Sequence, residues 1–215
     1  MLVTQKSQNS LPNIDSTNVE LCFSVVGKVI PADHGYGLYS ALTHCIKELH
    51  ELPGWSLGTI SGIPDQQGKI YLGDRSKLRI RLPYEQVPLV YPLAGKKITI
   101  GVHNIILGIP QIFTLSSASQ LRSRLVVIKG YQEPESFLAA AQRQLEKLGI
   151  KGNTYISTNS NGEIARKTIK IKKFTVVGFG LEIKNLDSED SLLLQKVGIG
   201  GKRRMGCGVF VPQKS

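Results

Sequence analysis

A glycine-rich segment near the C-terminus carries residue types that predict phosphate binding. From Gly198 to Gly208 the sequence reads Gly-Ile-Gly-Gly-Lys-Arg-Arg-Met-Gly-Cys-Gly, so two Gly-apolar-Gly triplets flank three consecutive cations. Glycine has no Cβ and lets the backbone approach another molecule closely, and backbone amides beside positive charge are suited to phosphate. The alternative is a flexible turn. The predicted contacts are Gly200, Gly201, Lys202, Arg203 and Arg204.

Several familiar catalytic and cofactor motifs are absent from the sequence. The glycine-rich segment has no Gly-Lys-Ser/Thr after four intervening residues, and it precedes an apolar strand-like run instead of opening a helix, so neither a nucleotidase phosphate loop nor a dinucleotide fingerprint is present. No Gly-x-Ser-x-Gly elbow occurs, and the acidic residues are scattered without metal-ligand spacing. We therefore expect no metal and no cofactor.

Four histidines are the side chains best suited to acid–base work near neutral pH, since the ordinary histidine pKa is about 6.5. They are His34, His44, His50 and His103. Helical spacing places His44 on a polar face with Ser40 and Lys47, which is either a reactive cluster or a solvated surface. His50 is expected beside a helix end, where it contacts terminal carbonyls, and His103 in a strand.

The charge balance favours a polyanionic partner. Lys and Arg number 27 against 16 Asp and Glu, a formal charge of +11, which points to nucleic acid first and an acidic membrane surface second. Two further basic clusters join the glycine-rich segment. One comprises Arg166, Lys167, Lys170, Lys172 and Lys173, and the other Arg75, Lys77, Arg79 and Arg81. Together the three predict a groove that follows a nucleic-acid backbone.

The remaining composition predicts a folded protein of the cytosol. Hydrophobic residues make up 41% of the chain, enough for a core. No apolar stretch reaches the ~20 residues of a membrane-spanning helix, and residues 1–18 are polar, without a signal pattern. The three cysteines are far apart, which favours buried thiols over disulfides or a zinc site.

The order of the predicted elements indicates a repeated unit. The first half reads as a strand over 19–30, a helix over 35–52, strands over 55–63, 68–72 and 77–82, a short helix over 84–94 and a strand over 97–107. The second half reads as strands over 111–115 and 121–129, a helix over 134–148, strands over 164–174 and 174–183, a helix over 188–197 and a last strand over 209–211. Each half thus has the βαββαβ order of a ferredoxin-like unit, as in RNA-recognition folds. We predict an α+β protein with a flexible segment at 1–18 and two tandem ferredoxin-like domains, 19–109 and 110–215.

Two motifs resemble a known family. The paired glycine triplets before a terminal strand are similar to the signature of the repeat-associated mysterious protein (RAMP) superfamily of CRISPR systems. Residues 31–42, Pro-Ala-Asp-His-Gly-Tyr-Gly-Leu-Tyr-Ser-Ala-Leu, resemble the start of the first helix in the compact MYXAN-type branch of pre-crRNA-processing endoribonucleases. The resemblance covers most of the chain.

This resemblance implies metal-independent cleavage of CRISPR repeat RNA. A ribose 2′-OH would attack the adjacent phosphate and leave a 2′,3′-cyclic phosphate and a 5′-OH, and the mature crRNA would be retained for an effector complex. His34 lies inside the motif and is the predicted general base or acid, held at the surface by its turn. His44 is a candidate second titrating group, Lys47 would stabilise negative charge, and Tyr39 would orient the phosphate. The glycine-rich loop would lie near His34 in space.

Two alternatives use the same residues. A non-catalytic RNA-binding subunit of a CRISPR effector would share the fold but would not need His34. A general ferredoxin-like RNA-binding module would leave the paired glycine triplets unexplained. Cleavage of repeat RNA in EDTA would distinguish the endoribonuclease from both of these alternatives.

Overall fold

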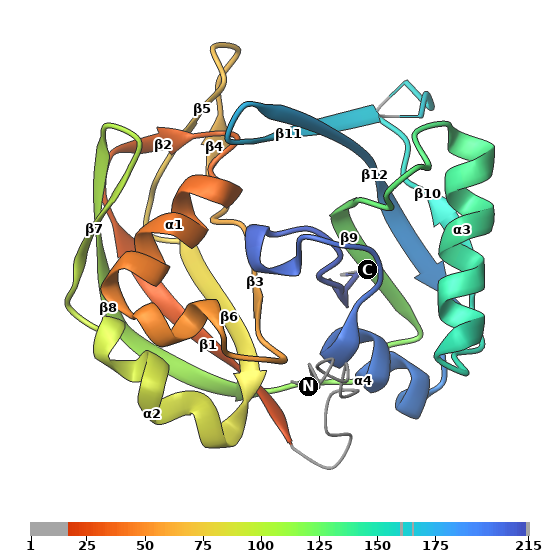
Figure 1. Cartoon of the computed structure of the whole chain (residues 1–215), viewed down its shortest axis with the longest axis horizontal. Helices are drawn as coiled ribbons and strands as arrows, with labels where there is room; N and C mark the ends of the chain where they lie inside the picture. Colours follow the sequence, from red (N-terminus) through yellow and green to blue (C-terminus); the bar gives the residue numbers. More distant parts are fainter. Residues whose placement is uncertain (1–16, 160, 165, 214–215) are drawn as a thin grey trace, which may run out of the picture.

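The first half of the chain forms one five-stranded sheet and a small three-stranded sheet. The computed structural model describes residues 17–159, 161–164 and 166–213 (Figure 1). The strands of this half are β1 (Asn18–Val26), β2 (Val29–Pro31), β3 (Ser56–Leu57), β4 (Ile63–Pro64), β5 (Lys69–Tyr71), β6 (Lys77–Pro83), β7 (Lys97–Ile100) and β8 (His103–Thr114). The helices are α1 (Gly35–Cys45), α2 (Val87–Val90) and the 3-10 turns η1 (Lys47–His50), η2 (Tyr84–Gln86) and η3 (Tyr91–Leu93).

The second half forms another sheet. Its strands are β9 (Gln120–Val126), β10 (Asn153–Ile156), β11 (Arg166–Ile171), β12 (Phe174–Lys184) and β13 (Val211–Pro212). Its helices are α3 (Pro134–Lys147), α4 (Ser188–Val197) and the turn η4 (Arg203–Met205) of the glycine-rich segment. The expected flexible segment falls mostly on residues 1–16, which lie outside the described residues.

Both halves have a βαββαβ order of elements, but the second strand of the second unit is β10 and not the strand predicted over 164–174. The first sheet runs β3-β6-β1-β8-β7 and the second β10-β12-β9-β13, with β11 paired to β12. In chain order, β1-α1-β3-β6-α2-β8 and β9-α3-β10-β12-α4-β13 are both βαββαβ units, and in both the first strand lies centrally between the third and fourth. In both units the first strand pairs antiparallel with both of its neighbours. The α+β class is confirmed.

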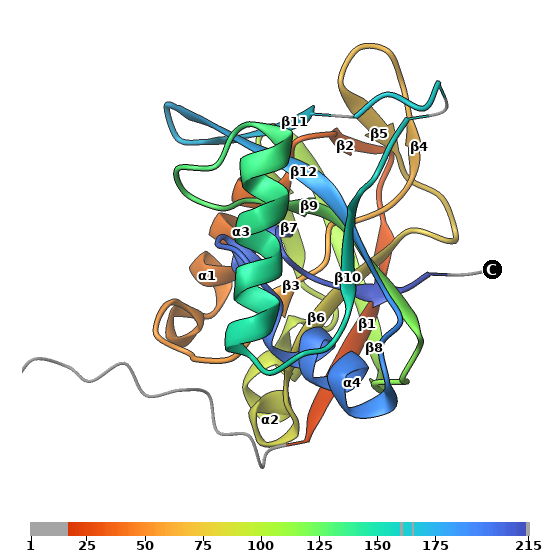
Figure 2. The same ribbon diagram turned by 90° about the vertical axis from the view of Figure 1, so that its right-hand side faces the viewer.

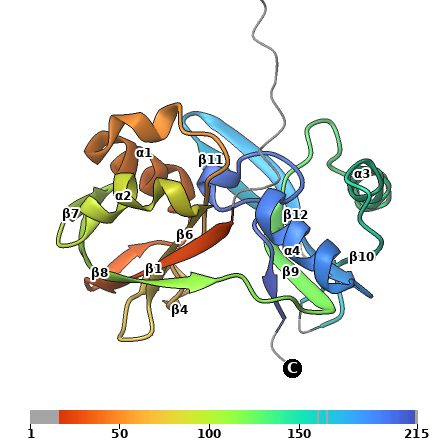
Figure 3. The same cartoon turned by 90° about the horizontal axis from the view of Figure 1, so that it is seen from below.

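Helices cover one face of each sheet. Figure 3 shows α1 and α2 on the same side of the first sheet, where Leu38 and Leu42 pack with the Phe23 side chain of β1 in a buried core. Figure 2 shows α3 running along the second sheet. Phe137 of α3 packs on Phe179 of β12, with ring centres 4.8 Å apart. The buried residues of α3 recur at helical spacing and form one face, made of Phe137, Ala140, Ala141 and Leu145.

Three details of the prediction are corrected by the structure. The helix predicted over 35–52 ends at Cys45, because Ile46 adopts an extended conformation. The domain boundary predicted at 109 falls inside β8, whose residues up to Thr114 pair with β1 of the first sheet. Strand β10, which pairs with β12, was not predicted. The chain therefore passes from the first sheet to the second within residues 115–119.

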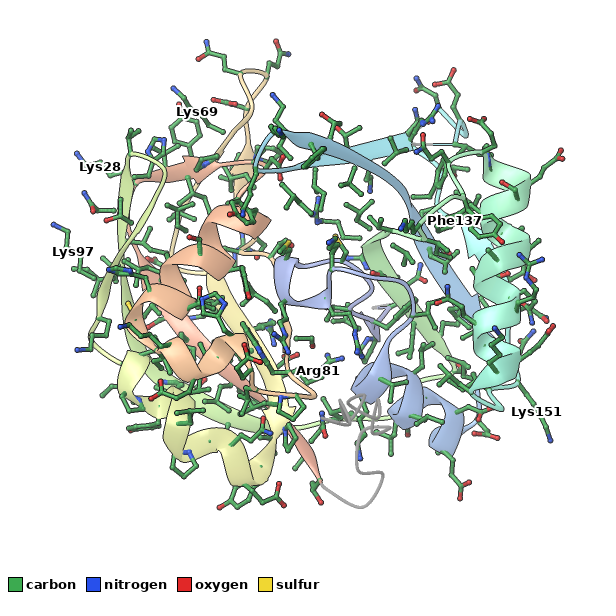
Figure 4. All side chains as sticks on the ribbon, in the orientation of Figure 1. Lys28, Lys69, Arg81, Lys97, Phe137 and Lys151 are labelled. Carbon is green, nitrogen blue, oxygen red and sulfur yellow. The ribbon has the colours of Figure 1, made fainter. Side chains whose placement is uncertain are left out.

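Arg81 joins the two halves. Its side chain is only 3% exposed, and it donates to the carbonyl oxygens of Gln195 (2.6 Å) and Phe210 (2.9 Å) and to Glu20 Oε2 (3.0 Å). Figure 4 shows Arg81 between the two halves, whereas Lys28, Lys69 and Lys97 project from the edge of the molecule. Arg79 pairs with Glu20 (2.5 Å). Arg81 was predicted to contact RNA, but it is buried and connects the two halves instead. Its positive charge lies at the C-terminal end of α4, where it is favourable for the helix dipole.

Candidate active site

The glycines of the Gly198–Gly208 segment allow close packing. Gly198 and Gly208 have left-handed φ angles of 58° and 64°, and a Cβ on either would collide with a backbone oxygen of the opposite triplet. The two triplets therefore lie back to back. A Cβ on Gly35 would collide with the carbonyl oxygen of Met205, so the start of α1 rests directly on η4. The expected proximity of the loop to the first helix is confirmed.

The backbone amides of this loop are used inside the protein. Gly200 N donates to Gln144 Oε1 (2.7 Å) and Gly201 N to the carbonyl oxygen of Val127 (2.8 Å). The amides of Met205, Gly206, Cys207 and Gly208 also donate to backbone carbonyls. The prediction that Gly200 and Gly201 bind phosphate through their N–H groups is therefore wrong, since both donors are already satisfied.

The three loop cations have different surroundings. Arg203 donates to the carbonyl oxygen of Val197 at the end of α4. Arg204 donates to the carbonyl oxygens of His50 (2.5 Å) and Leu52 (2.6 Å). Both arginines are half-buried, whereas Lys202 is exposed and has a φ of 65°. The structure thus leaves Lys202 as the loop cation most open to a ligand and uses the two arginines to fasten the loop.

His34 is buried, contrary to its predicted place at the surface. The side chain is 1% exposed. Its Nε2 accepts from the backbone N–H of Ile60 (2.9 Å), so Nδ1 carries the proton and donates to the carbonyl oxygen of Pro31 (2.9 Å). Burial lowers the pKa of His34, and the Pro31 hydrogen bond only partly opposes this effect. With both ring nitrogens bonded to backbone, His34 has the surroundings of a structural residue, not of a base facing RNA.

Tyr39 and His50 form the pair that the sequence did not predict. The Tyr39 hydroxyl lies 3.0 Å from His50 Nδ1, and the rings meet edge to face with centres 5.7 Å apart. In an unbroken helix, eleven residues separate two side chains by about 16 Å along the axis. The break at Ile46 turns η1 back toward α1 and brings the two rings together.

An open pocket of about 250 Å³ lies between Tyr39 and the glycine-rich loop. Tyr39 forms part of its wall and stacks on Trp55, with ring centres 6.1 Å apart. The Arg204 guanidinium also lies over the Trp55 ring, 5.8 Å from its centre. The lining residues are Tyr39, Gly54, Trp55, Lys202, Arg203, Arg204 and Met205. A phenol and an exposed amine therefore line one solvent-open space, and His50 is hydrogen-bonded to that phenol.

His44 and Lys47 lie away from this pocket. Gly35 and Tyr39 are four residues apart and share the face of α1 that meets the loop, whereas His44 follows Tyr39 by five residues and points to another side. Lys47 follows the break at Ile46, so the predicted i, i+3 pair with His44 is not on one helix. Both side chains are exposed.

The basic cluster of β11 is divided between structural and exposed members. Arg166 pairs with Glu133 (3.6 Å), and Lys167 Nζ donates to the carbonyl oxygen of Arg124 (3.2 Å). Burial, with Arg124 and Arg122 nearby, lowers the pKa of Lys167. Lys170 and Lys172 are exposed.

Asp33 ties this strand to the start of α1. Its Oδ2 accepts from the backbone N–H of Lys170 (2.6 Å), so the basic hairpin of β11 and β12 is fixed beside the first half of the chain. Arg122 and Arg124 of β9, both exposed, extend the positive surface. These two arginines were not predicted to bind RNA. Arginine does alternate with other residues over Leu121–Leu125, which indicates one basic face of a strand.

The described part of the chain lacks both a metal-ligand cluster and a membrane-spanning helix. No group of three or more His, Cys, Asp or Glu side chains there is arranged to hold a metal ion. None of the described helices, the 14-residue α3 included, is long and apolar enough to cross a membrane.

Comparison with known proteins identifies the family. A family model described as Cas6 Crispr matches residues 19–215. The CRISPR-associated endonuclease Cas6 of Myxococcus xanthus (strain DK1622) is 36% identical over 194 residues, which cover 90% of this chain and 81% of that protein.

Solved structures show the same fold at low identity. A CRISPR associated protein Cas6 superposes with a TM-score of 0.65 at 15% identity, covering 93% of this chain and 100% of the other. A RAMP protein binding different RNA substrates superposes with a TM-score of 0.63 at 13% identity, covering 92% and 100%. With the family match over residues 19–215, these findings establish that this chain belongs to the Cas6 family of CRISPR-associated proteins.

Proposed function

We propose that this chain is a metal-independent endoribonuclease that cuts CRISPR repeat RNA in the cytoplasm, with the Tyr39–His50 pair at its active site. The observation that carries this proposal is the hydrogen bond between Tyr39 and His50 beside a pocket that Lys202 also lines. The endonuclease named in Myxococcus xanthus supports the reaction class. The burial of His34 argues against the catalytic role that the motif suggested for it.

The proposed reaction needs only proton transfers. The ribose 2′-oxygen attacks the adjacent phosphorus while the bond from phosphorus to the next 5′-oxygen breaks. One proton leaves the 2′-hydroxyl and one reaches the 5′-oxygen, which yields a 2′,3′-cyclic phosphate and a 5′-hydroxyl. Because Tyr39 occupies Nδ1, His50 would exchange its proton through Nε2.

Lys202 would stabilise the charge that develops on the phosphate. Its side chain is exposed, in a loop that Arg203 attaches to the end of α4 and Arg204 attaches to the end of η1. A lysine in the left-handed region costs about 1 kcal/mol relative to glycine, and such strain is often retained at functional sites. The positive charge at this position supports an electrostatic role.

The RNA would follow the exposed cations from the pocket toward β11. Lys170, Lys172, Arg122 and Arg124 supply charge on the second half, and the Asp33 contact holds that half beside α1. Contacts of this kind position a backbone without reading bases. The cleaved product would stay bound there and pass to effector subunits.

Incubation of the protein with its repeat RNA in EDTA tests the proposal. We expect cleavage at one site, blocked by a 2′-deoxy nucleotide before the cut and lost in His50→Gln. A substrate with sulfur in place of the leaving 5′-oxygen needs no protonation of the leaving group. If this substrate restores His50→Gln, then His50 is the acid; if not, it is the base.

Three outcomes would contradict this assignment. Wild-type rates in His50→Gln would exclude His50, and loss of cleavage in His44→Gln instead would move the chemistry to the other side of α1. Tight binding without cleavage would favour the second candidate function, a non-catalytic RNA-binding subunit.

A further inference from the structure

Arg204 connects the glycine-rich loop to the segment that bears His50. Its two terminal nitrogens donate separately to the carbonyl oxygens of His50 (2.5 Å) and Leu52 (2.6 Å), and its guanidinium lies 5.8 Å from the ring centre of Trp55. These contacts span 154 and 152 residues of sequence. The side chain is thus held by two carbonyls and an aromatic face.

The two carbonyls are at the end of η1, where a helix leaves acceptors without intrahelical partners. His50 is the last residue of η1, and Glu51 and Leu52 turn the chain away through hydrogen bonds to the Glu48 carbonyl oxygen. Arg204 therefore closes this helix end from across the molecule. Since the backbone of His50 is fixed by Arg204 and its ring by Tyr39, the imidazole is held at both ends.

We propose that Arg204 is a positioning residue that sets the orientation of the His50 imidazole toward the scissile phosphate. The inference rests on the proposed function of His50 and replaces the expectation that Arg204 binds RNA phosphate. A phosphate-binding role would require the guanidinium to give up bonds to two carbonyls. The planar fork of arginine fits both acceptors, whereas the single ammonium of lysine does not.

This role predicts that charge alone is not sufficient. In Arg204→Lys the loop keeps its charge, yet the end of η1 loses one or both bonds. Small misplacement of a catalytic group costs up to about 100-fold in rate. We expect the single-turnover cleavage rate at saturating RNA to fall roughly 10- to 100-fold in Arg204→Lys and Arg204→Gln, with the affinity for 2′-deoxy repeat RNA changed less than about twofold.

Arg143→Gln is the matched control. Arg143 also lies over an aromatic ring, 5.5 Å from the ring centre of Tyr131, and also donates a hydrogen bond, to the Tyr131 hydroxyl (3.2 Å). It is an exposed residue of α3 in the other half of the chain. Cleavage and binding by this variant should match the wild type, so a general effect of losing an arginine would be visible.

An NMR titration of the RNA-free protein gives a readout independent of cleavage. Arg204→Lys should change the ring resonances and the titration of His50 and leave those of His44 in place. In the His50→Gln background, Arg204→Gln should slow cleavage no further. Unchanged His50 signals and rate, or a loss of affinity with an unchanged saturating rate, would overturn the inference. If His50→Gln cleaves normally, the proposed function fails, while the titration still reports whether Arg204 orients His50.

Discussion

The two histidines on either side of α1 have opposite surroundings. His34, before the helix, is buried with both ring nitrogens bonded to backbone, beside Asp33 and Gly35, which hold the two halves together. His50, after the helix, is exposed and touches a phenol. A histidine that the backbone fully satisfies stabilises a joint, whereas one that keeps a nitrogen toward solvent can exchange protons. If His50 acts as proposed, two histidines close in sequence serve stability and chemistry separately.

The largest expected effect is the loss of cleavage activity when His50 is replaced. His50→Ala should reduce the saturating cleavage rate roughly 10²- to 10⁴-fold, the usual contribution of a general acid or base. Its unfolding free energy should change by less than about 1 kcal/mol, because the side chain is exposed. Cleavage kinetics and urea denaturation of the same preparation check both halves of this prediction.

The converse substitution should affect stability first. His34→Ala removes both partners of the Ile60 N–H and Pro31 carbonyl groups inside the protein, which should cost roughly 2–5 kcal/mol of unfolding free energy. Urea denaturation measures the loss. Any folded fraction of this variant should retain RNA cleavage; a stable but inactive His34→Ala protein would reverse the comparison.

Low pH should reduce the contribution of His34 to folding stability. The pKa of folded His34 is lowered by burial, while the unfolded side chain has a pKa of about 6.5. Above that pH both states are neutral and the His34 contribution is fully present. As pH falls below it, the unfolded state binds the extra proton and stability decreases. His34→Gln, which can accept and donate but does not titrate, should show a smaller difference in unfolding free energy between pH 8 and pH 5.

The phenol beside His50 should matter less than His50 itself. Tyr39→Phe keeps the stack on Trp55 and removes the hydrogen bond to Nδ1. Loss of one such bond is worth about 1 kcal/mol, so cleavage should slow roughly 5- to 10-fold. A decrease as large as that of His50→Ala would instead give the Tyr39 hydroxyl a proton-transfer role of its own.

At Lys202, the positive charge and the backbone strain have opposite consequences for binding and stability. Lys202→Gly and Lys202→Ala both remove the amine, and both should lower the salt dependence of RNA binding by about 0.7 in log–log slope. Only glycine relieves the positive φ, so Lys202→Gly should be more stable than Lys202→Ala, by up to about 1 kcal/mol. Equal stability of the two variants would contradict the strain argument.

Local sequence patterns were sufficient to predict those helices whose formation depends on residues close to one another in the sequence. The helices predicted over 134–148 and 188–197 are present, because α3 has apolar residues at helical spacing and Asp187 caps α4 by accepting from the Asp190 N–H. The Ile46 break did not follow, because a helical spacing of apolar residues continues through it. The His50 site was therefore missed.

Basic residues were hard to assign for a related reason. Arg81 and Arg204 have the sequence appearance of exposed cations, yet their partners are carbonyls more than 100 residues away. A backbone carbonyl accepts from arginine without leaving any mark on the residue type that carries it. The paired glycine triplets were readable as a motif, while their use in packing depended on which segments they meet in the fold.

The distance in sequence between His50 and Arg204 has a consequence for synthesis on the ribosome. The first sheet and α1 are translated long before the loop that lines the other wall of the pocket. Domains generally fold in the order in which they emerge. A nascent chain would thus hold its histidine and phenol without the opposing cations for about 150 residues of elongation. Cutting competence would arise in one late step, so unfinished chains would not degrade RNA.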